Sequence, residues 1–263
     1  MKAITANGIV LHVADQGPED AHALVFSNSL GSDFRIWDRV VARLPANLRI
    51  IRYDKRGHGL STSTDAPYSI EDHRGDLADL LDGLGVRQAT VVGLSVGGLI
   101  GQSLAGARPD LVKSLVLADT AHKIGPPDIW ETRIEAISKG GIVALADAIL
   151  ERWFSADFRR DRSDEVEVWR AMLCRTPVEG YLGTCHAIRD ADLTEIAKAL
   201  TVPVVCLVGS EDGATTPALV KSTADLIGAD FIEIDGAGHL PCIEAPDEVA
   251  DVITKFLRET GVT

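Results

Sequence analysis

The sequence predicts an α/β protein: a mostly parallel central β-sheet with helices on both faces, interrupted by an inserted helical segment. Strand and amphipathic-helix patterns alternate through residues 1–120. This alternation is typical of a parallel sheet, because a long crossover must join each pair of parallel strands. The alternation is lost in residues 128–200, where we find no convincing strand pattern, and strand patterns return at 203–208. We therefore expect an α/β domain with a helical insertion.

Residue spacing predicts the individual elements. Apolar runs and alternating patterns predict strands at 9–14, 23–27, 49–53, 89–92, 114–118, 203–208 and 230–234. Apolar residues at helical spacing predict helices at 35–44, 69–84, 97–107 and 246–258. Ser69, with Asp72 three residues later, is a helix N-cap pattern. We expect residues 1–120 and 196–263 to form the core domain and 121–195 to form a helical cap over the strand ends.

Composition and charge exclude several classes of partner and ligand. The chain has 263 residues, 46% of them hydrophobic, and a formal net charge of −13. Phosphate backbones and anionic lipids attract basic surfaces, so we expect neither a nucleic-acid partner nor membrane docking. The four cysteines lack C-x-x-C spacing and the histidines are dispersed, so we expect no metal site. A signal-peptide pattern is not found, which predicts a cytoplasmic protein; the oligomeric state stays open.

The strongest motif is G-x-S-x-G at residues 93–97, with Ser95 at its centre. An expected strand leads into it and an expected helix leads out, which is the context of a tight turn that exposes a nucleophilic serine. Gly93 and Gly97 allow close chain packing where a Cβ would clash. The helix N-terminus favours negative charge that develops at Ser95. A plain N-cap serine is the alternative interpretation, and the flanking elements favour the nucleophile.

A serine hydroxyl needs a base, and the base needs an acid that orients it. With this kind of turn the partners follow in the order serine, acid, histidine. His239 is the only histidine after His186, and it lies in a Gly-rich loop after the strand at 230–234. The acid should follow the strand at 203–208, where both Glu211 and Asp212 qualify.

The tetrahedral intermediate of such a reaction needs an oxyanion hole. One donor is the backbone N–H of the residue after the nucleophile, Val96. The second should come from the loop after the strand at 23–27, where the Leu30 N–H is the expected donor. Both groups are therefore candidate site residues through their backbone.

These motifs belong to a longer resemblance, carried by residues 27–31, 52–61, 68–72, 92–98, 119–125 and 237–240. Because these stretches are spread along the chain, it resembles the α/β-hydrolase superfamily from end to end. Within that superfamily it resembles the 3-oxoadipate enol-lactonases of the β-ketoadipate pathway. The G-x-S-x-G turn occurs across the superfamily and specifies little about substrate. S-N-S-L-G at 27–31 and D-T-A-x-K-I-G at 119–125 are narrower. Where most relatives carry His-Gly before the oxyanion residue, this chain has Asn28-Ser29, which resembles the lactonases.

The resemblance implies the α/β-hydrolase fold and favours Asp212 over Glu211 as the acid. It also implies that Ser95, His239 and Asp212 open the ester bond of 3-oxoadipate enol-lactone to give 3-oxoadipate, in the breakdown of aromatic compounds. We expect no cofactor. The alternatives are a general small-molecule carboxylesterase, a cofactor-free perhydrolase, or a small-ligand receptor derived from a hydrolase. A haloalkane dehalogenase is disfavoured, because that chemistry uses an aspartate where this chain has Ser95.

An anionic lactone in a protein of net charge −13 needs a local cation. Trp130 and Arg133 are three residues apart early in the expected cap, so on one helix they share a face. We expect Trp130 to wall the lactone ring and Arg133 to pair with the carboxylate. Arg152 and Lys123 are alternative cations. A core tryptophan beside a solvated arginine is the structural alternative.

Overall fold

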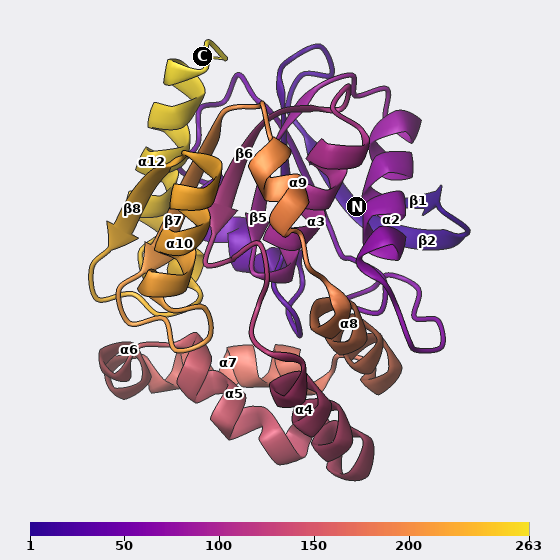
Figure 1. The fold of residues 1–263 in the computed structure, drawn as a ribbon, viewed down its shortest axis with the longest axis vertical. Coiled ribbons are helices and arrows are strands. Elements are labelled where there is room, and N and C mark those ends of the chain that lie inside the picture. Colours follow the sequence, from indigo (N-terminus) through magenta and orange to yellow (C-terminus); the bar gives the residue numbers. More distant parts are fainter. Residues whose placement is uncertain (263) are drawn as a thin grey trace.

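An eight-stranded sheet forms the centre of the molecule in the computed structural model, which describes residues 1–262 (Figure 1). The strand order is β1-β2-β4-β3-β5-β6-β7-β8. The first two pairings in this order are antiparallel, and the five that follow are parallel. The predicted mostly parallel sheet is therefore confirmed.

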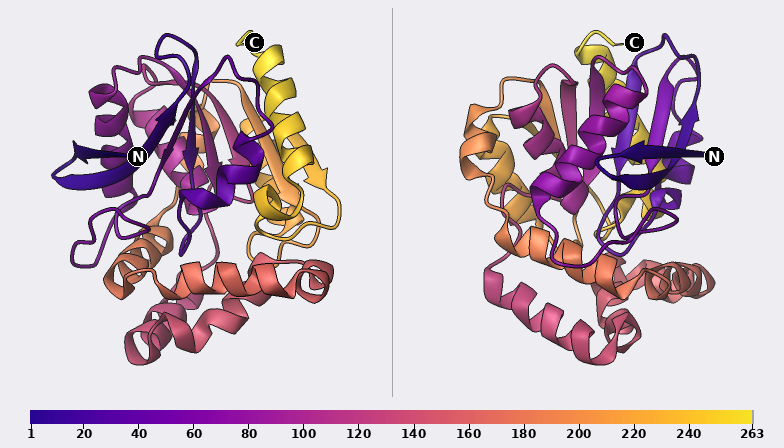
Figure 2. Two further views of the ribbon diagram at one scale, coloured as in Figure 1. Left: turned by 180° about the vertical axis from the view of Figure 1, so that it is seen from behind. Right: turned by 90° about the vertical axis from the view of Figure 1, so that its right-hand side faces the viewer.

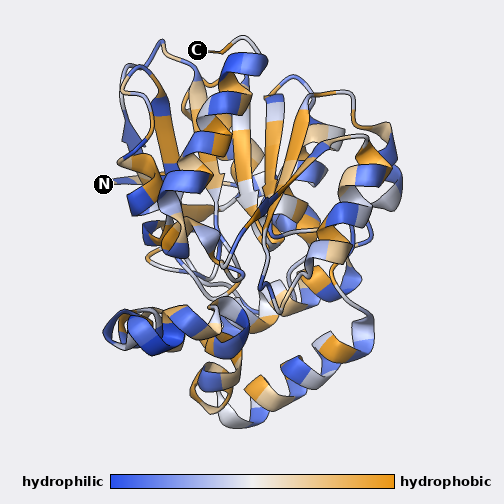
Figure 3. Ribbon diagram, turned by 90° about the vertical axis from the view of Figure 1, so that its left-hand side faces the viewer, coloured by the Kyte–Doolittle hydropathy of each residue, from blue (hydrophilic) through white to orange (hydrophobic). Residues whose placement is uncertain are grey.

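The strands are β1 Lys2–Ala6, β2 Ile9–Gln16, β3 Ala23–Ser27, β4 Arg49–Tyr53, β5 Ala89–Leu94, β6 Val112–Ala118, β7 Val204–Gly209 and β8 Asp230–Ile234. Every strand expected from the sequence is present. Only β1 was missed, because it is an edge strand with mostly exposed residues and so has no apolar run to reveal it. In contrast, β3, β4 and β5 are buried along their whole length. Much of the central sheet has the hydrophobic colour in Figure 3.

Helices cover both faces of the sheet (Figure 2). The core helices are α1 Asp38–Val41, α2 Ile70–Gly83, α3 Val96–Ala107, α9 Thr194–Ala199, α10 Pro217–Ile227, α11 Pro241–Glu244 and α12 Pro246–Glu259. The predicted N-cap residue of α2 is confirmed, because Ser69 and Asp72 form a reciprocal capping box at the start of this helix. The helix expected at 35–44 is instead the 3₁₀-helix Phe34–Trp37 followed by α1, which ends before Pro45 restricts the backbone of the preceding residue.

The remaining helices gather in a separate layer below the sheet in Figure 1. They are α4 Pro127–Gly140, α5 Ala146–Trp153, α6 Ala156–Asp161, α7 Ser163–Cys174 and α8 Val178–Asp190, with a 3₁₀ turn at Ile142–Leu145. The loops after the parallel strands meet this layer: Gly57 touches Gly180, and Gly238 touches the backbone of Trp153. We propose that the cap ends at Asp190 rather than at residue 195, because α9 packs against α3 and α10 of the core.

None of the helices within residues 1–262 is both long enough and apolar enough to cross a membrane.

Candidate active site

Ser95 lies in the sharp turn between β5 and α3. Its φ of 57° falls in the left-handed region, which a non-glycine residue adopts only at a cost. Close packing holds the turn: a Cβ on Gly97 would lie 2.1 Å from the carbonyl oxygen of Ser27, and one on Gly93 would lie 2.3 Å from that of Gly97. The hydroxyl of Thr120 also donates a 2.7 Å hydrogen bond to the Ser95 carbonyl. The expected strand–turn–helix geometry is therefore present.

His239 and Asp212 form a buried pair at the carboxyl ends of β8 and β7. The Nδ1–H of His239 donates to Asp212 Oδ2 at 2.9 Å, which leaves Nε2 unprotonated and able to accept a proton. Their exposed fractions are 2% and 4%, whereas Glu211 points to solvent. The structure thus joins His239 to the acid that the sequence analysis favoured.

Hydrogen bonds from the next turn of chain surround the Asp212 carboxylate. Oδ1 accepts from the N–H groups of Ala214 at 2.6 Å and Thr215 at 3.0 Å, and Oδ2 lies 2.6 Å from the Thr215 hydroxyl. Burial opposes ionisation of Asp212, but the positive charge that His239 carries once its ring is protonated, together with these hydrogen bonds, outweighs burial and holds the pKa of Asp212 below its ordinary value. Asp212 is therefore an ionised acid that can stabilise an imidazolium.

A narrow pocket of about 90 Å³ collects most of the predicted site residues. Its lining includes Ser95, His239, Leu30, Trp130 and Arg133, together with the alternative cation Arg152. Within residues 1–262 the Ser95 hydroxyl makes no hydrogen bond to His239. Catalytic hydrogen bonds are often long in ligand-free enzymes and tighten when substrate binds.

The tryptophan and the arginine of α4 lie as expected on one helix face. Trp130 is buried, and its Nε1 donates to the Ile124 carbonyl at 2.7 Å, which fixes the ring. The Arg133 guanidinium lies over that ring, 5.0 Å from its centroid. Among residues 1–262, no carboxylate forms an ion pair with Arg133 or Arg152, whereas the third candidate, Lys123, pairs with Asp192 at 2.9 Å.

Both expected oxyanion donors are available. Within residues 1–262, neither the Leu30 nor the Val96 N–H donates to another group, the latter because it is in the first turn of α3. The loop that carries Leu30 is braced from below by residues after β4. Lys55 Nζ donates to the Ser29 carbonyl at 2.6 Å, and the Gly31 N–H donates to His58 Nε2 at 3.0 Å. These two bonds flank Leu30 on either side.

The protonation of His58 suits this role. Its Nδ1–H donates to the Arg56 carbonyl at 3.0 Å, so Nε2 is free to accept. Burial, and then the charge of Lys55, hold the pKa of His58 well below its ordinary value and keep the ring neutral. Burial also lowers the pKa of Lys55 to about 7, and either protonation state of the amine can donate to Ser29. From the sequence, His58 is expected only to shape the turn after β4; its contact with the Leu30 loop, and that of Lys55, appear only in the structure.

The D-T-A stretch after β6 also contacts the site in a way that the sequence did not predict. Asp119 and Thr120 both lie against the site, and Thr215 bridges the acid loop to the Asp119 carbonyl at 2.7 Å. The narrow match of residues 119–125 to the lactonases was the available signal, but nothing in the sequence indicated which atoms these side chains would meet.

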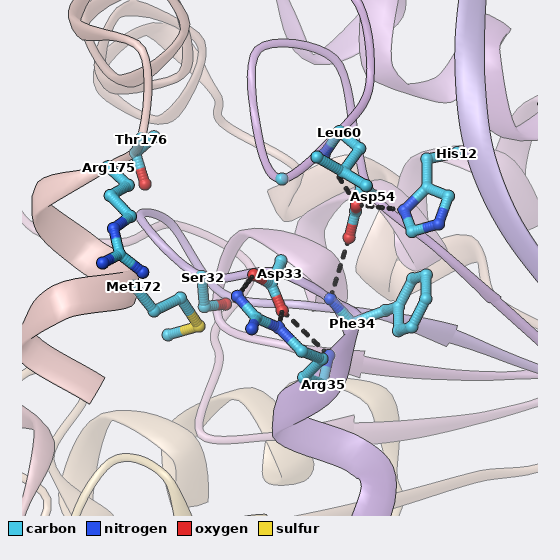
Figure 4. Close-up of a pocket in the computed structure, with 11 residues that line it drawn as sticks. His12, Ser32, Asp33, Phe34, Arg35, Asp54, Leu60, Met172, Arg175 and Thr176 are labelled. Atoms are coloured by element: carbon cyan, nitrogen blue, oxygen red, sulfur yellow. Dashed lines mark hydrogen bonds and ion pairs between the residues drawn. The ribbon is translucent and has the colours of Figure 1, made fainter. Parts of the chain in front are cut away.

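A larger cavity of about 370 Å³ is lined by Ser32, Asp33 and Arg35, which follow Leu30 in the chain, and by residues of α7 and of the loop after β4 (Figure 4). Its lining contains none of the predicted site residues, and several of its charges are already paired. Arg35 grips Asp33 through two bonds, and Asp54 accepts from the Phe34 N–H at 2.9 Å and lies 2.7 Å from His12 Nδ1. We therefore locate the chemistry in the narrow pocket.

We expect Lys55→Met to lower kcat about tenfold with little change in KM, because a shifted Leu30 N–H would stabilise the transition state less. The effect should be smaller than the loss of a whole oxyanion donor, which lowers kcat by about 10²–10³-fold. Steady-state hydrolysis of p-nitrophenyl acetate measures both constants. Lys139→Met on the exposed end of α4 is the matched control and should leave them unchanged. An unchanged kcat in Lys55→Met would show that the loop does not depend on the brace.

Similarity to known proteins agrees with this geometry. A model of the Alpha/beta hydrolase family matches residues 22–252. The 3-oxoadipate enol-lactonase 2 of Acinetobacter baylyi is 34% identical over 255 residues, 97% of this chain and 96% of that protein. The enol-lactonase structure from Burkholderia xenovorans LB400 has a TM-score of 0.94 at 37% identity and covers 98% of this chain and 100% of its own. A thermophilic esterase from Thermogutta terrifontis, with malate bound, has a TM-score of 0.93 at 26% identity over 99% of both chains. The sheet order, the turn at Ser95 and these matches together establish that the chain belongs to the α/β-hydrolase family.

Proposed function

We propose that this hydrolase opens 3-oxoadipate enol-lactone to 3-oxoadipate, with Ser95 as nucleophile, His239 as base and Asp212 as the orienting acid. The enol-lactonases of A. baylyi and B. xenovorans, at 34% and 37% identity over nearly the whole chain, support the substrate. The observation that carries the proposal is Arg133, which lies over Trp130 in the same pocket as Ser95 and His239 and forms no ion pair with a carboxylate among residues 1–262.

The mechanism follows from the positions of these groups. Ser95 Oγ attacks the lactone carbonyl carbon while His239 Nε2 takes its proton, and the new oxyanion is bound by the N–H groups of Leu30 and Val96. The bond from this carbon to the enol oxygen then breaks, and His239 returns the proton to the leaving oxygen. The enol, which stays part of the acyl group on Ser95, tautomerises to the ketone. Water attacks the acyl-enzyme with His239 again as base, which frees Ser95 and leaves a second carboxylate on the product.

Substrate selection rests on charge. A carboxylated lactone is repelled by a protein of net charge −13 unless the pocket offers a cation that no carboxylate of residues 1–262 already neutralises. Arg133 is half-buried on the Trp130 ring, whereas Arg152 is exposed. A partly desolvated guanidinium binds a carboxylate more strongly than an exposed one, and its planar fork can form two bonds. We therefore assign the substrate carboxylate to Arg133 and the lactone ring to Trp130.

A general carboxylesterase is the second candidate, supported by the 26% identical esterase of T. terrifontis. It would use the same nucleophile, base and oxyanion donors. The two candidates differ only in whether the pocket requires an anionic group on the substrate.

We expect Ser95→Ala to abolish turnover while the thermal unfolding midpoint stays close to that of the wild type, because the hydroxyl is the nucleophile. A fluorophosphonate serine probe, read by mass spectrometry, should label the wild type at Ser95. An active Ser95→Ala enzyme, or labelling at another serine instead, would refute the mechanism.

We expect Asp212→Asn to lower kcat by several orders of magnitude, in line with about 10⁴ for the same change in a serine protease. The amide presents an N–H toward Nδ1 and favours the wrong imidazole tautomer. Glu211→Gln, one residue away and exposed, is the matched control and should change kcat by less than about threefold. If Glu211→Gln is the more damaging change, the acid is Glu211.

We expect Arg133→Ala to raise KM at least about tenfold for the enol-lactone, because a charged hydrogen bond is worth roughly 1.5–3 kcal/mol. Hydrolysis of p-nitrophenyl acetate, which has no carboxylate to bind, should barely change. Lys139→Ala alters the net charge equally from the far end of α4 and should affect neither substrate.

The same measurements separate the alternatives. Equal losses with both substrates would make Arg133 structural, and a selective loss in Arg152→Ala would move the carboxylate to α5. A wild-type enzyme that cleaves neutral esters well but cannot open the enol-lactone is a general esterase.

A further inference from the structure

Asp119 is a carboxyl group next to the catalytic residues to which the mechanism above gives no role. It is the first residue after β6, where the D-T-A stretch begins, and it is fully buried. Its φ of 46° places it in the left-handed region, like Ser95. A strained backbone and a buried carboxyl group both carry a cost, which a packed core tolerates only where the surrounding contacts fix them.

The two oxygens of Asp119 have different surroundings. Oδ1 accepts a 2.9 Å hydrogen bond from the Gly209 N–H at the end of β7. Oδ2 is buried and finds no donor among residues 1–262. Side-chain oxygens of Asp119 and Asp212 and a ring nitrogen of His239 lie within 4.8 Å of one another. The unpartnered oxygen therefore belongs to a carboxyl group that lies against the acid of the proposed triad.

Two carboxyl groups this close in a buried site cannot both be ionised at low cost, so one holds a proton. Asp212 has the donors that an anion needs: two N–H groups and the His239 ring, and in addition the Thr215 hydroxyl, whose single proton is shared with the Asp119 carbonyl. Asp119 has one. Burial, and next the charge of Asp212, raise the pKa of Asp119 well above its ordinary value, with a smaller contribution from Glu244. The proton therefore resides on Asp119.

We propose that Asp119 is a neutral positioning residue, whose carboxylic acid donates a hydrogen bond to the carboxylate of Asp212 and thereby holds it in line with His239. This rests on the proposed function only in taking Asp212 and His239 as the acid and base. The bond gives the unpartnered oxygen a role as donor. It also links the ends of β6 and β7, where the Thr215 hydroxyl lies within hydrogen-bond distance of both the Asp119 carbonyl and the Asp212 carboxylate.

A metal ion held by the same three side chains is the competing interpretation, and the donor set argues against it. Both oxygens of Asp212 already accept hydrogen bonds from protein groups. A metal on His239 Nδ1 would displace the proton that this nitrogen donates to Asp212. Coordination would therefore break the bonds that hold the pair together.

The sign of a pH shift distinguishes a neutral Asp119 from an ionised one. Asp119→Asn is close in shape to the protonated acid, keeps an N–H donor for Asp212 and tolerates a positive φ. We expect its kcat/KM for p-nitrophenyl acetate within about threefold of the wild type and the acidic limb of the pH profile unmoved. If Asp119 were ionised, Asp119→Asn would remove a negative charge beside the base, and the acidic limb would move to lower pH.

Asp119→Ala removes the donor. Asp212 would then interact more strongly with the imidazolium, so the acidic limb should move to higher pH and kcat should fall about tenfold or more as the carboxylate loses its fixed position. The other titratable groups near Asp119 are Cys242 and Glu244, which are unchanged in both variants.

Three outcomes would overturn the proposal: a loss in Asp119→Asn as large as that in Asp212→Asn, a shift of its acidic limb to lower pH, or wild-type kinetics in Asp119→Ala. Thermal unfolding of each variant checks the fold, and if Asp119→Ala does not fold, Asp119→Asn alone decides. Because the assay uses a neutral ester and compares variants with an active wild type, failure of the enol-lactone assignment would not affect the result.

Discussion

The backbone at Ser95 is the constraint on which the site depends. A left-handed conformation at a non-glycine residue costs about 1–3 kcal/mol, so it persists only where neighbouring contacts leave no alternative. Here the close approach of Gly97 to the β3 backbone and the Thr120 hydrogen bond to the Ser95 carbonyl fix the turn. Any side chain at Gly97 would push α3 away from the sheet. These contacts keep the backbone of Ser95 from relaxing to a regular helix start, and the serine side chain therefore stays directed into the pocket.

The parallel sheet brings the remaining groups to the same edge. The loops after β3, β5, β7 and β8 carry Leu30, Ser95, Asp212 and His239, respectively. Since the carboxyl ends of parallel strands coincide, residues far apart in the chain meet without any long loop. The cap closes this edge and contributes Trp130 and Arg133, which explains how the pocket can be cationic in a protein of net charge −13.

Burial determines how the charged groups at this edge behave. Asp212 stays ionised because it has several donors, whereas Asp119, with one donor and a charged neighbour, has its pKa raised. Lys55 illustrates the same balance for a base: burial lowers its pKa to about 7 despite the nearby Asp54 and Asp33. Low dielectric surroundings strengthen each paired interaction and penalise each unpaired charge.

The sequence by itself determined the α/β class, seven of the eight strands and the identities of Ser95 and His239 as candidates. These features depend on local pattern: apolar period, turn glycines and the order of motifs along the chain. The edge strand β1 and the extent of the helix before Pro45 escaped prediction, because exposed or short elements have weak periodicity.

Only the tertiary structure decided which side chains meet. His239 contacts Asp212 and not its neighbour Glu211, a choice between two adjacent residues. Lys55 and His58 support the Leu30 loop, although they are distant from it in sequence. Asp119 likewise lies beside the distant Asp212. The ion pair of Lys123 with Asp192 likewise joins the segment before α4 to the segment after α8, whereas Arg133, within α4, forms no ion pair among residues 1–262. Such contacts depend on the relative placement of strands and helices, which no local pattern of residues encodes.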